Sequence, residues 1–140
     1  MMKKVCIIGV GLIGGSLAKA INKTHQSEIV FGFGRDKSRL EKAQKSNVID
    51  QYSTDIGEAL DGANMVIIAI PVGSYESILR EMKPYITKEM LISDVGSTKV
   101  SVIQAVKSVF GNTLDNFIPA HPIAAVSYTH LRAHEPEADG

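Results

Sequence analysis

Short apolar runs rich in β-branched residues alternate with longer amphipathic stretches along the 140-residue chain, and this alternation restricts the possible folds most. It is typical of a parallel sheet whose strands are joined by crossover helices. The predicted strands span residues 5–8, 28–33, 49–52, 65–70, 90–93 and 117–120, and the predicted helices span residues 12–23, 36–46, 55–60, 74–82 and 99–110. Because such crossovers are short and right-handed, the pattern predicts a single α/β domain with a doubly wound parallel sheet.

A G-x-G-x-x-G run from Gly9 to Gly14 lies between the first predicted strand and the first predicted helix. In such a run Gly9 permits the tight turn, Gly11 lets the backbone approach a pyrophosphate, and Gly14 lets helix and strand pack closely. The helix start at Leu12 and Ile13 offers free amide hydrogens to that anion. This context predicts a Rossmann-type dinucleotide-binding site. A purely structural glycine turn is the alternative.

The end of the second predicted strand bears on which dinucleotide binds. NAD-specific sites usually place a carboxylate there for the ribose 2′-hydroxyl, whereas an arginine accommodates the 2′-phosphate of NADP. Here Gly34 occupies the expected position, followed by Arg35 and Asp36 as candidate cofactor-binding residues. Glycine removes the repulsion of the 2′-phosphate and Arg35 could add attraction. We therefore expect NAD or NADP as cofactor, with NADP tolerated or even preferred. The alternative is that Arg35 points to solvent and Asp36 only caps the next helix.

Bulk composition argues against several classes of protein. Fifteen basic residues balance 15 acidic ones, so no net charge directs the chain to nucleic acid or to a membrane surface. No apolar stretch reaches the roughly 18 residues of a membrane span, and the first residues do not read as a signal peptide. The single cysteine, Cys6, excludes an internal disulfide and fits a reducing compartment. We therefore expect a cytoplasmic protein with neither nucleic-acid nor membrane partners, in which Cys6 is a buried apolar residue.

Four segments together resemble the prephenate dehydrogenase family, over about residues 3–124. They are residues 11–17 (GLIGGSL), 69–72 (AIPV), 94–99 (DVGSTK) and 121–124 (HPIA). The combination of the last two segments is specific to that family. The glycine turn alone also occurs in 6-phosphogluconate-like and 3-hydroxyisobutyrate-like dehydrogenases, which are the alternative enzyme reading. A non-catalytic dinucleotide-binding module is the alternative from another class.

The resemblance implies oxidative decarboxylation of prephenate to 4-hydroxyphenylpyruvate in tyrosine biosynthesis, or the same reaction of arogenate. NAD, which members of the family usually use, or NADP would accept the hydride. The resemblance gives His121 the proton of the substrate hydroxyl, a role that suits a neutral imidazole. It places Ser97 against the substrate hydroxyl or nicotinamide, and Ile70 and Pro71 along the nicotinamide side. The alternatives are that His121 only orders its loop and that Ser97 only caps a helix.

The resemblance ends after Ala124. Family members continue with a glycine and an acidic residue, whereas residues 126–140 resemble a translated transposase-end adapter used for sequencing libraries. We therefore expect residues 1–125 to form the dinucleotide-binding domain and residues 126–140 to be a disordered, non-native tail. His130 and His134 within it are then a chance pattern, and we expect no metal site. The family's helical second domain, which holds the prephenate carboxylates and most of the homodimer interface, would be missing, so we expect the chain alone to be inactive.

Overall fold

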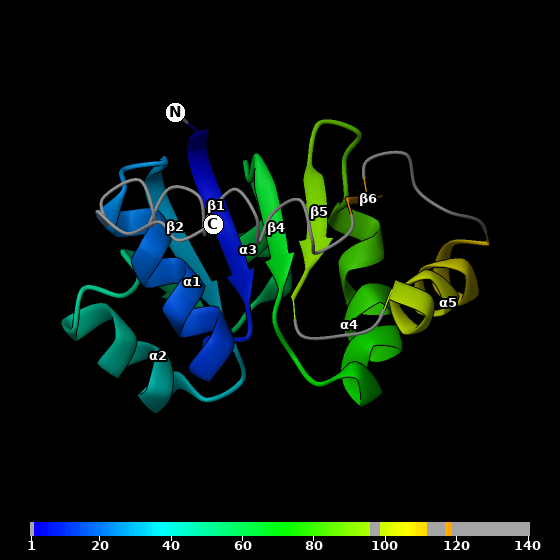
Figure 1. Ribbon diagram of the computed structural model, residues 1–140, viewed down its shortest axis with the longest axis horizontal. Coiled ribbons are helices and arrows are strands. Elements are labelled where there is room, and N and C mark those ends of the chain that lie inside the picture. Colours follow the sequence, from blue (N-terminus) through cyan, green and yellow to red (C-terminus); the bar gives the residue numbers. More distant parts are fainter. Residues whose placement is uncertain (1, 96–98, 112–116, 119–140) are drawn as a thin grey trace, which may run out of the picture.

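The predicted strands come together in one parallel sheet (Figure 1). The computed structural model describes residues 2–95, 99–111 and 117–118. The strands among these residues are β1 (Met2–Ile8), β2 (Ser27–Phe33), β3 (Gln51–Ser53), β4 (Met65–Ile68), β5 (Leu91–Asp94) and β6 (Phe117–Ile118). All pairings are parallel, in the order β3-β2-β1-β4-β5-β6. This is the strand order of the doubly wound Rossmann fold, so the predicted fold class is confirmed.

The helices follow the strands in the predicted alternation. They are α1 (Leu12–Lys23), α2 (Lys37–Lys45), α3 (Ile56–Leu60), α4 (Tyr75–Met82) and α5 (Lys99–Phe110), with 3₁₀ turns at Val72–Ser74 and Lys83–Tyr85. In Figure 1, α1 and α2 lie at the β1–β2 side of the sheet, while α4 and α5 lie beyond β5. The bounds of α1 and α5 are those predicted. Within the described residues, no helix is long and apolar enough to cross a membrane.

The fourth strand ends two residues before its predicted end, at Ile68. The amide of Ala69 still donates to the carbonyl of Ile8 (2.8 Å), but the chain then leaves the sheet. Neither neighbour continues the ladder, because β1 turns away at Gly9 and β5 ends at Asp94. As a result Ile70 and Pro71, which were expected to close a strand, lie in a loop at the carboxyl edge of the sheet.

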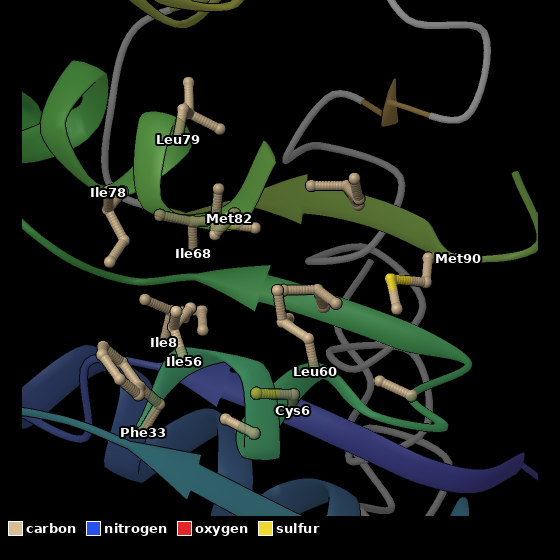
Figure 2. Packing of buried hydrophobic residues seen from close by; sticks show 14 of the residues in the cluster. Cys6, Ile8, Phe33, Ile56, Leu60, Ile68, Ile78, Leu79, Met82 and Met90 are labelled. Atoms are coloured by element: carbon tan, nitrogen blue, oxygen red, sulfur yellow. The ribbon is translucent and has the colours of Figure 1, made fainter. Parts of the chain in front are cut away.

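Two apolar layers hold the helices against the sheet, one on each face. Successive residues of β1 enter different layers, since side chains alternate along a strand; this explains why residues 5–8 form an uninterrupted apolar run. One layer contains Val5, Ile7, Ala18, Ile21 and Leu40, with α1 and α2. The other contains Cys6, Ile8, Phe33, Leu60, Ile68, Ile78, Leu79 and Met82, with α3 and α4 (Figure 2).

Cys6 is free and completely buried within the second layer. Burial raises the pKa of its thiol to about 12, against a smaller lowering effect of the nearby Lys4 ammonium. The prediction that Cys6 is a buried apolar residue is confirmed. A thiol with so high a pKa is an unreactive part of the core.

A candidate dinucleotide-binding cleft

The turn after β1 depends on glycine at its first position. Gly9 has a φ of +94°, which residues with a side chain rarely adopt. A Cβ there would lie 2.6 Å from Cγ2 of Ile70 and 2.7 Å from the carbonyl oxygen of Ala69. The Gly9 amide donates to the carbonyl of Phe33 (2.9 Å). The turn is therefore held tightly between the ends of β2 and β4.

The other two glycines of the run have opposite surroundings. A Cβ on Gly14 would overlap the carbonyl oxygen of Gly9 and lie 3.1 Å from Cβ of Ala69. Gly14 is thus the point where α1 packs against the strand ends. Around Gly11, in contrast, no described atom lies within 4 Å of the Cβ position. The backbone at Gly11 is therefore open to a group approaching from outside.

The start of α1 carries the groups that an anion needs. Gly11 is the N-cap residue, no side chain among the described residues caps the helix, and its first turn contains no acidic residue. The first amides of an α-helix have no partner within the helix, and the helix dipole makes that end positive. Ile13, in the same turn, is 54% exposed. The helix start therefore has backbone donors of the kind that bind phosphate.

A cleft of about 360 Å³ opens beside this turn. It lies between the ends of β2 and β4 and the beginning of α4, and its volume is in the usual range for ligand pockets. Its lining consists of Ile8, Gly9, Phe33, Gly34, Arg35, Ile70, Pro71, Gly73, Ser74, Ser77 and Ile78. Among these, Ile8, Phe33 and Ile78 also belong to the core layer of Figure 2, so the cleft has a packed apolar floor.

The position of the cleft agrees with a general rule for doubly wound sheets. Ligands of such sheets bind at the carboxyl ends of the strands, where the strand order reverses. Here the order reverses between β1 and β4, and residues that follow both strands line the cleft. A second cleft of about 340 Å³ is lined by residues of α3, Tyr85 and Met90. It contains none of the predicted site residues, so the first cleft is the candidate site.

The two charged residues after β2 have different roles. The guanidinium of Arg35 forms an ion pair with the carboxylate of Glu81 in α4, and the two side chains are 67% and 38% exposed. The carboxylate of Asp36 accepts a hydrogen bond from the amide of Arg39 (3.3 Å) and so caps α2. Asp36 thus has the capping role that the alternative interpretation expected. Arg35 has a protein partner and is not simply solvated.

Asp94, the first residue of the DVGSTK segment, is buried at the end of β5. The hydroxyl of Tyr75, also buried, lies 3.2 Å from the Asp94 carboxylate and 3.3 Å from the carbonyl of Ile68. A hydrogen bond from this hydroxyl therefore links the start of α4 to the carboxyl ends of β4 and β5. The polar group that opens this segment has a structural partner in α4.

The structure brings some of the predicted site residues together and leaves others apart. Gly9, Arg35, Ile70 and Pro71 share the cleft, whereas Gly11, Leu12, Ile13 and Gly14 form the adjoining turn and helix start. Asp36 lies next to Arg35 but outside the lining residues. Ile70 and Pro71, which were expected along the nicotinamide side, line the cleft together with Gly34 at the β2 end, where such folds bind the ribose of the adenosine half. His121 and Ser97 lie outside the described residues.

Sequence reasoning missed three polar residues of α4 and the turn before it. Ser74 and Ser77 line the cleft, and Glu81 pairs with Arg35. Positions three and four apart share one face of a helix, so a polar 74-77-81 pattern was available in the sequence. Nothing in the sequence, however, says that this face lies opposite the end of β2.

A parallel sheet in this strand order, with a glycine turn and a cleft where the order reverses, defines a dinucleotide-binding domain of the dehydrogenase class. Residues 17–130 match the family model described as prephenate dehydrogenase, nucleotide-binding domain. The chain therefore belongs to the prephenate dehydrogenase family, as the four segments indicated, and its domain is nucleotide-binding.

Individual relatives give the same result. The chain is 36% identical over 125 residues to the prephenate dehydrogenase of Lactococcus lactis, covering 88% of the chain and 34% of that protein. It is 32% identical over 124 residues to the cyclohexadienyl dehydrogenase of Zymomonas mobilis, covering 89% of the chain and 42% of that protein. The chain thus spans about a third to two fifths of the length of these relatives.

Solved structures support the fold. The prephenate dehydrogenase from A. aeolicus, in complex with hydroxyphenyl propionate and NAD⁺, is similar with a TM-score of 0.74 at 24% identity; the match covers 85% of this chain and 41% of that one. A putative prephenate dehydrogenase from Corynebacterium glutamicum is similar with a TM-score of 0.70 at 30% identity, covering 84% and 36%.

Proposed function

We propose that the chain binds a nicotinamide dinucleotide, NAD or NADP, in the cleft beside Gly9, as the cofactor-binding part of a prephenate dehydrogenase. The observation that carries the proposal is the cleft of about 360 Å³ at the point where the strand order reverses. It lies next to a helix start that no side chain among the described residues caps. The pyrophosphate would lie against the open backbone at Gly11 and the first amides of α1. The adenosine would occupy the cleft between the end of β2 and the Ile70–Pro71 loop.

The residues of the cleft fit such a group. Its apolar floor of Ile8, Phe33 and Ile78 suits a planar ring, and the turn leaves room for phosphate where a side chain on Gly11 would stand. At the β2 end, Gly34 carries no carboxylate that would repel a 2′-phosphate, and Arg35 could donate hydrogen bonds to that phosphate. These features support tolerance of NADP. The NAD⁺ in the A. aeolicus relative supports NAD.

In the whole enzyme, a cytoplasmic protein by expectation, the reaction would be oxidative decarboxylation of prephenate, or of arogenate. The bound dinucleotide would supply the hydride acceptor. His121 would take the proton of the substrate hydroxyl, and Ser97 would contact that hydroxyl or the nicotinamide; the DVGSTK and HPIA segments support these two roles. A helical second domain would hold the substrate carboxylates and form most of the homodimer interface. This chain alone would then bind cofactor without turning over prephenate.

Calorimetric titration of the 140-residue chain with NAD and with NADP tests the binding proposal. We expect saturable binding of one dinucleotide per chain, with competition by ADP-ribose, because the adenosine and pyrophosphate make most of the contacts. Binding of neither dinucleotide at millimolar concentration would overturn the proposal.

The chemical role of His121 is tested by His121→Asn in a complete enzyme that carries this domain. Asparagine keeps a polar side chain but cannot accept a proton at neutral pH. Turnover should fall by about 10²- to 10⁴-fold, with the dissociation constant of the cofactor nearly unchanged. Unchanged turnover would remove His121 from the mechanism.

A further inference from the structure

We infer that Glu81 of α4 is a specificity-determining residue that favours NAD over NADP, by holding Arg35 and by placing a carboxylate beside the 2′ position of the adenosine ribose. The inference rests on the proposed binding of a nicotinamide dinucleotide in the cleft. It starts from an ion pair between two residues 46 positions apart in the chain.

The ion pair lies at the edge of the cleft. Arg35 follows β2 and is one of the lining residues, and its guanidinium meets the carboxylate of Glu81. Arg35 is the residue that would attract a 2′-phosphate. In the structure that guanidinium already has an anionic partner, so a phosphate could use Arg35 only by displacing or sharing Glu81.

The wall formed by α4 has a polar face toward Arg35. Ser74 and Ser77 line the cleft, and Glu81 follows Ser77 by four residues, which puts it on the same face of the helix. Ser74 occupies the N-cap position of α4, but within the described part of the chain its hydroxyl does not cap the helix. The wall therefore offers hydroxyl groups near the turn and one carboxylate farther along.

Electrostatics then separates the two cofactors. Since the residue that follows β2 is Gly34, the carboxylate that usually discriminates at this strand end is absent. Glu81 provides a carboxylate in the same region from a different element. A neutral 2′-hydroxyl can donate a hydrogen bond to a carboxylate. A 2′-phosphate, which carries a charge of about −2, is repelled by a carboxylate. Wild-type protein should therefore prefer NAD, and Arg35 should become available to a 2′-phosphate only when Glu81 releases it.

A purely structural role for the pair makes a different prediction. If the pair acted only in the fold, its loss would not change the ratio of the dissociation constants for NADP and NAD. Exposed ion pairs contribute little to stability, so the unfolding midpoint should also stay nearly unchanged. A role in selectivity would instead change the ratio of the dissociation constants for NADP and NAD. The two readouts can be measured on the same variant.

The experiment is calorimetric titration of Glu81→Gln with NAD and NADP at low salt. We expect the dissociation constant for NADP to fall about 10-fold and that for NAD to change less than about 2-fold. The reason is that Arg35, released from Glu81, can bind the 2′-phosphate, which only NADP carries. The gain should shrink at high salt, where exposed charges are screened. Adding Arg35→Gln to this variant should abolish the gain.

Glu76→Gln is the matched control. Glu76 lies on the same helix, outside the lining residues, and its carboxylate is 4.0 Å from Arg80. The substitution changes the net charge by the same amount, so any general effect of charge on NADP binding appears there too. An unchanged NADP-to-NAD ratio in Glu81→Gln, or the same change in both variants, overturns the inference. Failure of wild-type protein to bind NAD would instead overturn the proposed function itself.

Discussion

The two chain segments that meet at the cleft, the turn after β1 and the residues after β2, are built in different ways. The turn is determined by local sterics: Gly9 has a positive φ with backbone and side-chain atoms close by, and Gly14 has the Gly9 carbonyl where a Cβ would be. The end of β2 has ordinary space around Gly34, and its polar contacts reach a distant helix through Arg35 and Glu81.

The difference separates binding from discrimination. In the proposed binding mode the glycine turn places backbone amides against the pyrophosphate, which every nicotinamide dinucleotide carries. In the proposed binding mode the end of β2 meets the ribose, where NAD and NADP differ. Substitutions in the turn should therefore weaken both cofactors together, and substitutions near the end of β2 should change their ratio.

The largest effect is expected for Gly14→Ala. The new Cβ would overlap the Gly9 carbonyl oxygen, and only a shift of α1 away from the strand ends would relieve it. We expect the free energy of unfolding to fall by about 3 kcal/mol and both dinucleotides to bind more than about 100-fold more weakly. Thermal unfolding and calorimetry measure the two effects.

Gly15→Ala is the control for this substitution. No described atom lies within 4 Å of the Cβ position of Gly15, which is also in α1. Alanine there should stabilise the chain by about 0.5–1 kcal/mol through helix propensity. Equal losses at the two positions would contradict the steric account of the turn.

A smaller and selective effect is expected for Gly34→Asp. The backbone accepts a side chain, because the nearest described atom, Cδ2 of Leu40, is 3.4 Å from the Cβ position. The new carboxylate should raise the dissociation constant for NADP about 30-fold by repulsion and change that for NAD less than about 3-fold. Titration of the variant, with Gly34→Ala as the uncharged control, measures the ratio. If both cofactors weakened equally, the ribose would not lie at this strand end.

The smallest effect is expected for Asp36→Ala. Loss of the cap on α2 should reduce the free energy of unfolding by about 1 kcal/mol, while Asp36→Asn, which can still cap, should be nearly neutral. We expect NAD affinity to stay within about 2-fold in both variants, because the carboxylate is engaged by the helix. A clear loss of NAD affinity in Asp36→Asn would show that Asp36 contacts the cofactor, as the sequence interpretation first suggested.

Most of the fold was predictable, since its determinants are local. A strand buried on both faces and an amphipathic helix leave different periodicities, which is why the bounds of α1 and α5 agree with the structure. The end of β4 was not predictable, because it depends on where β1 and β5 stop. The glycine turn was recognisable from the spacing of its glycines and from its place between a predicted strand and a predicted helix. The roles of His121 and Ser97 stay predictions.

The sequence by itself determined the alternation of strands and helices, the glycine turn and the family, because short runs of neighbouring residues specify each of them. Only the tertiary structure decided what surrounds the end of β2. It put Ile70 and Pro71 opposite Gly34 and paired Arg35 with Glu81. These residues are far apart in the chain, and the parallel sheet brings their elements to one edge through the crossovers, so their charges act on one another only after the fold has formed.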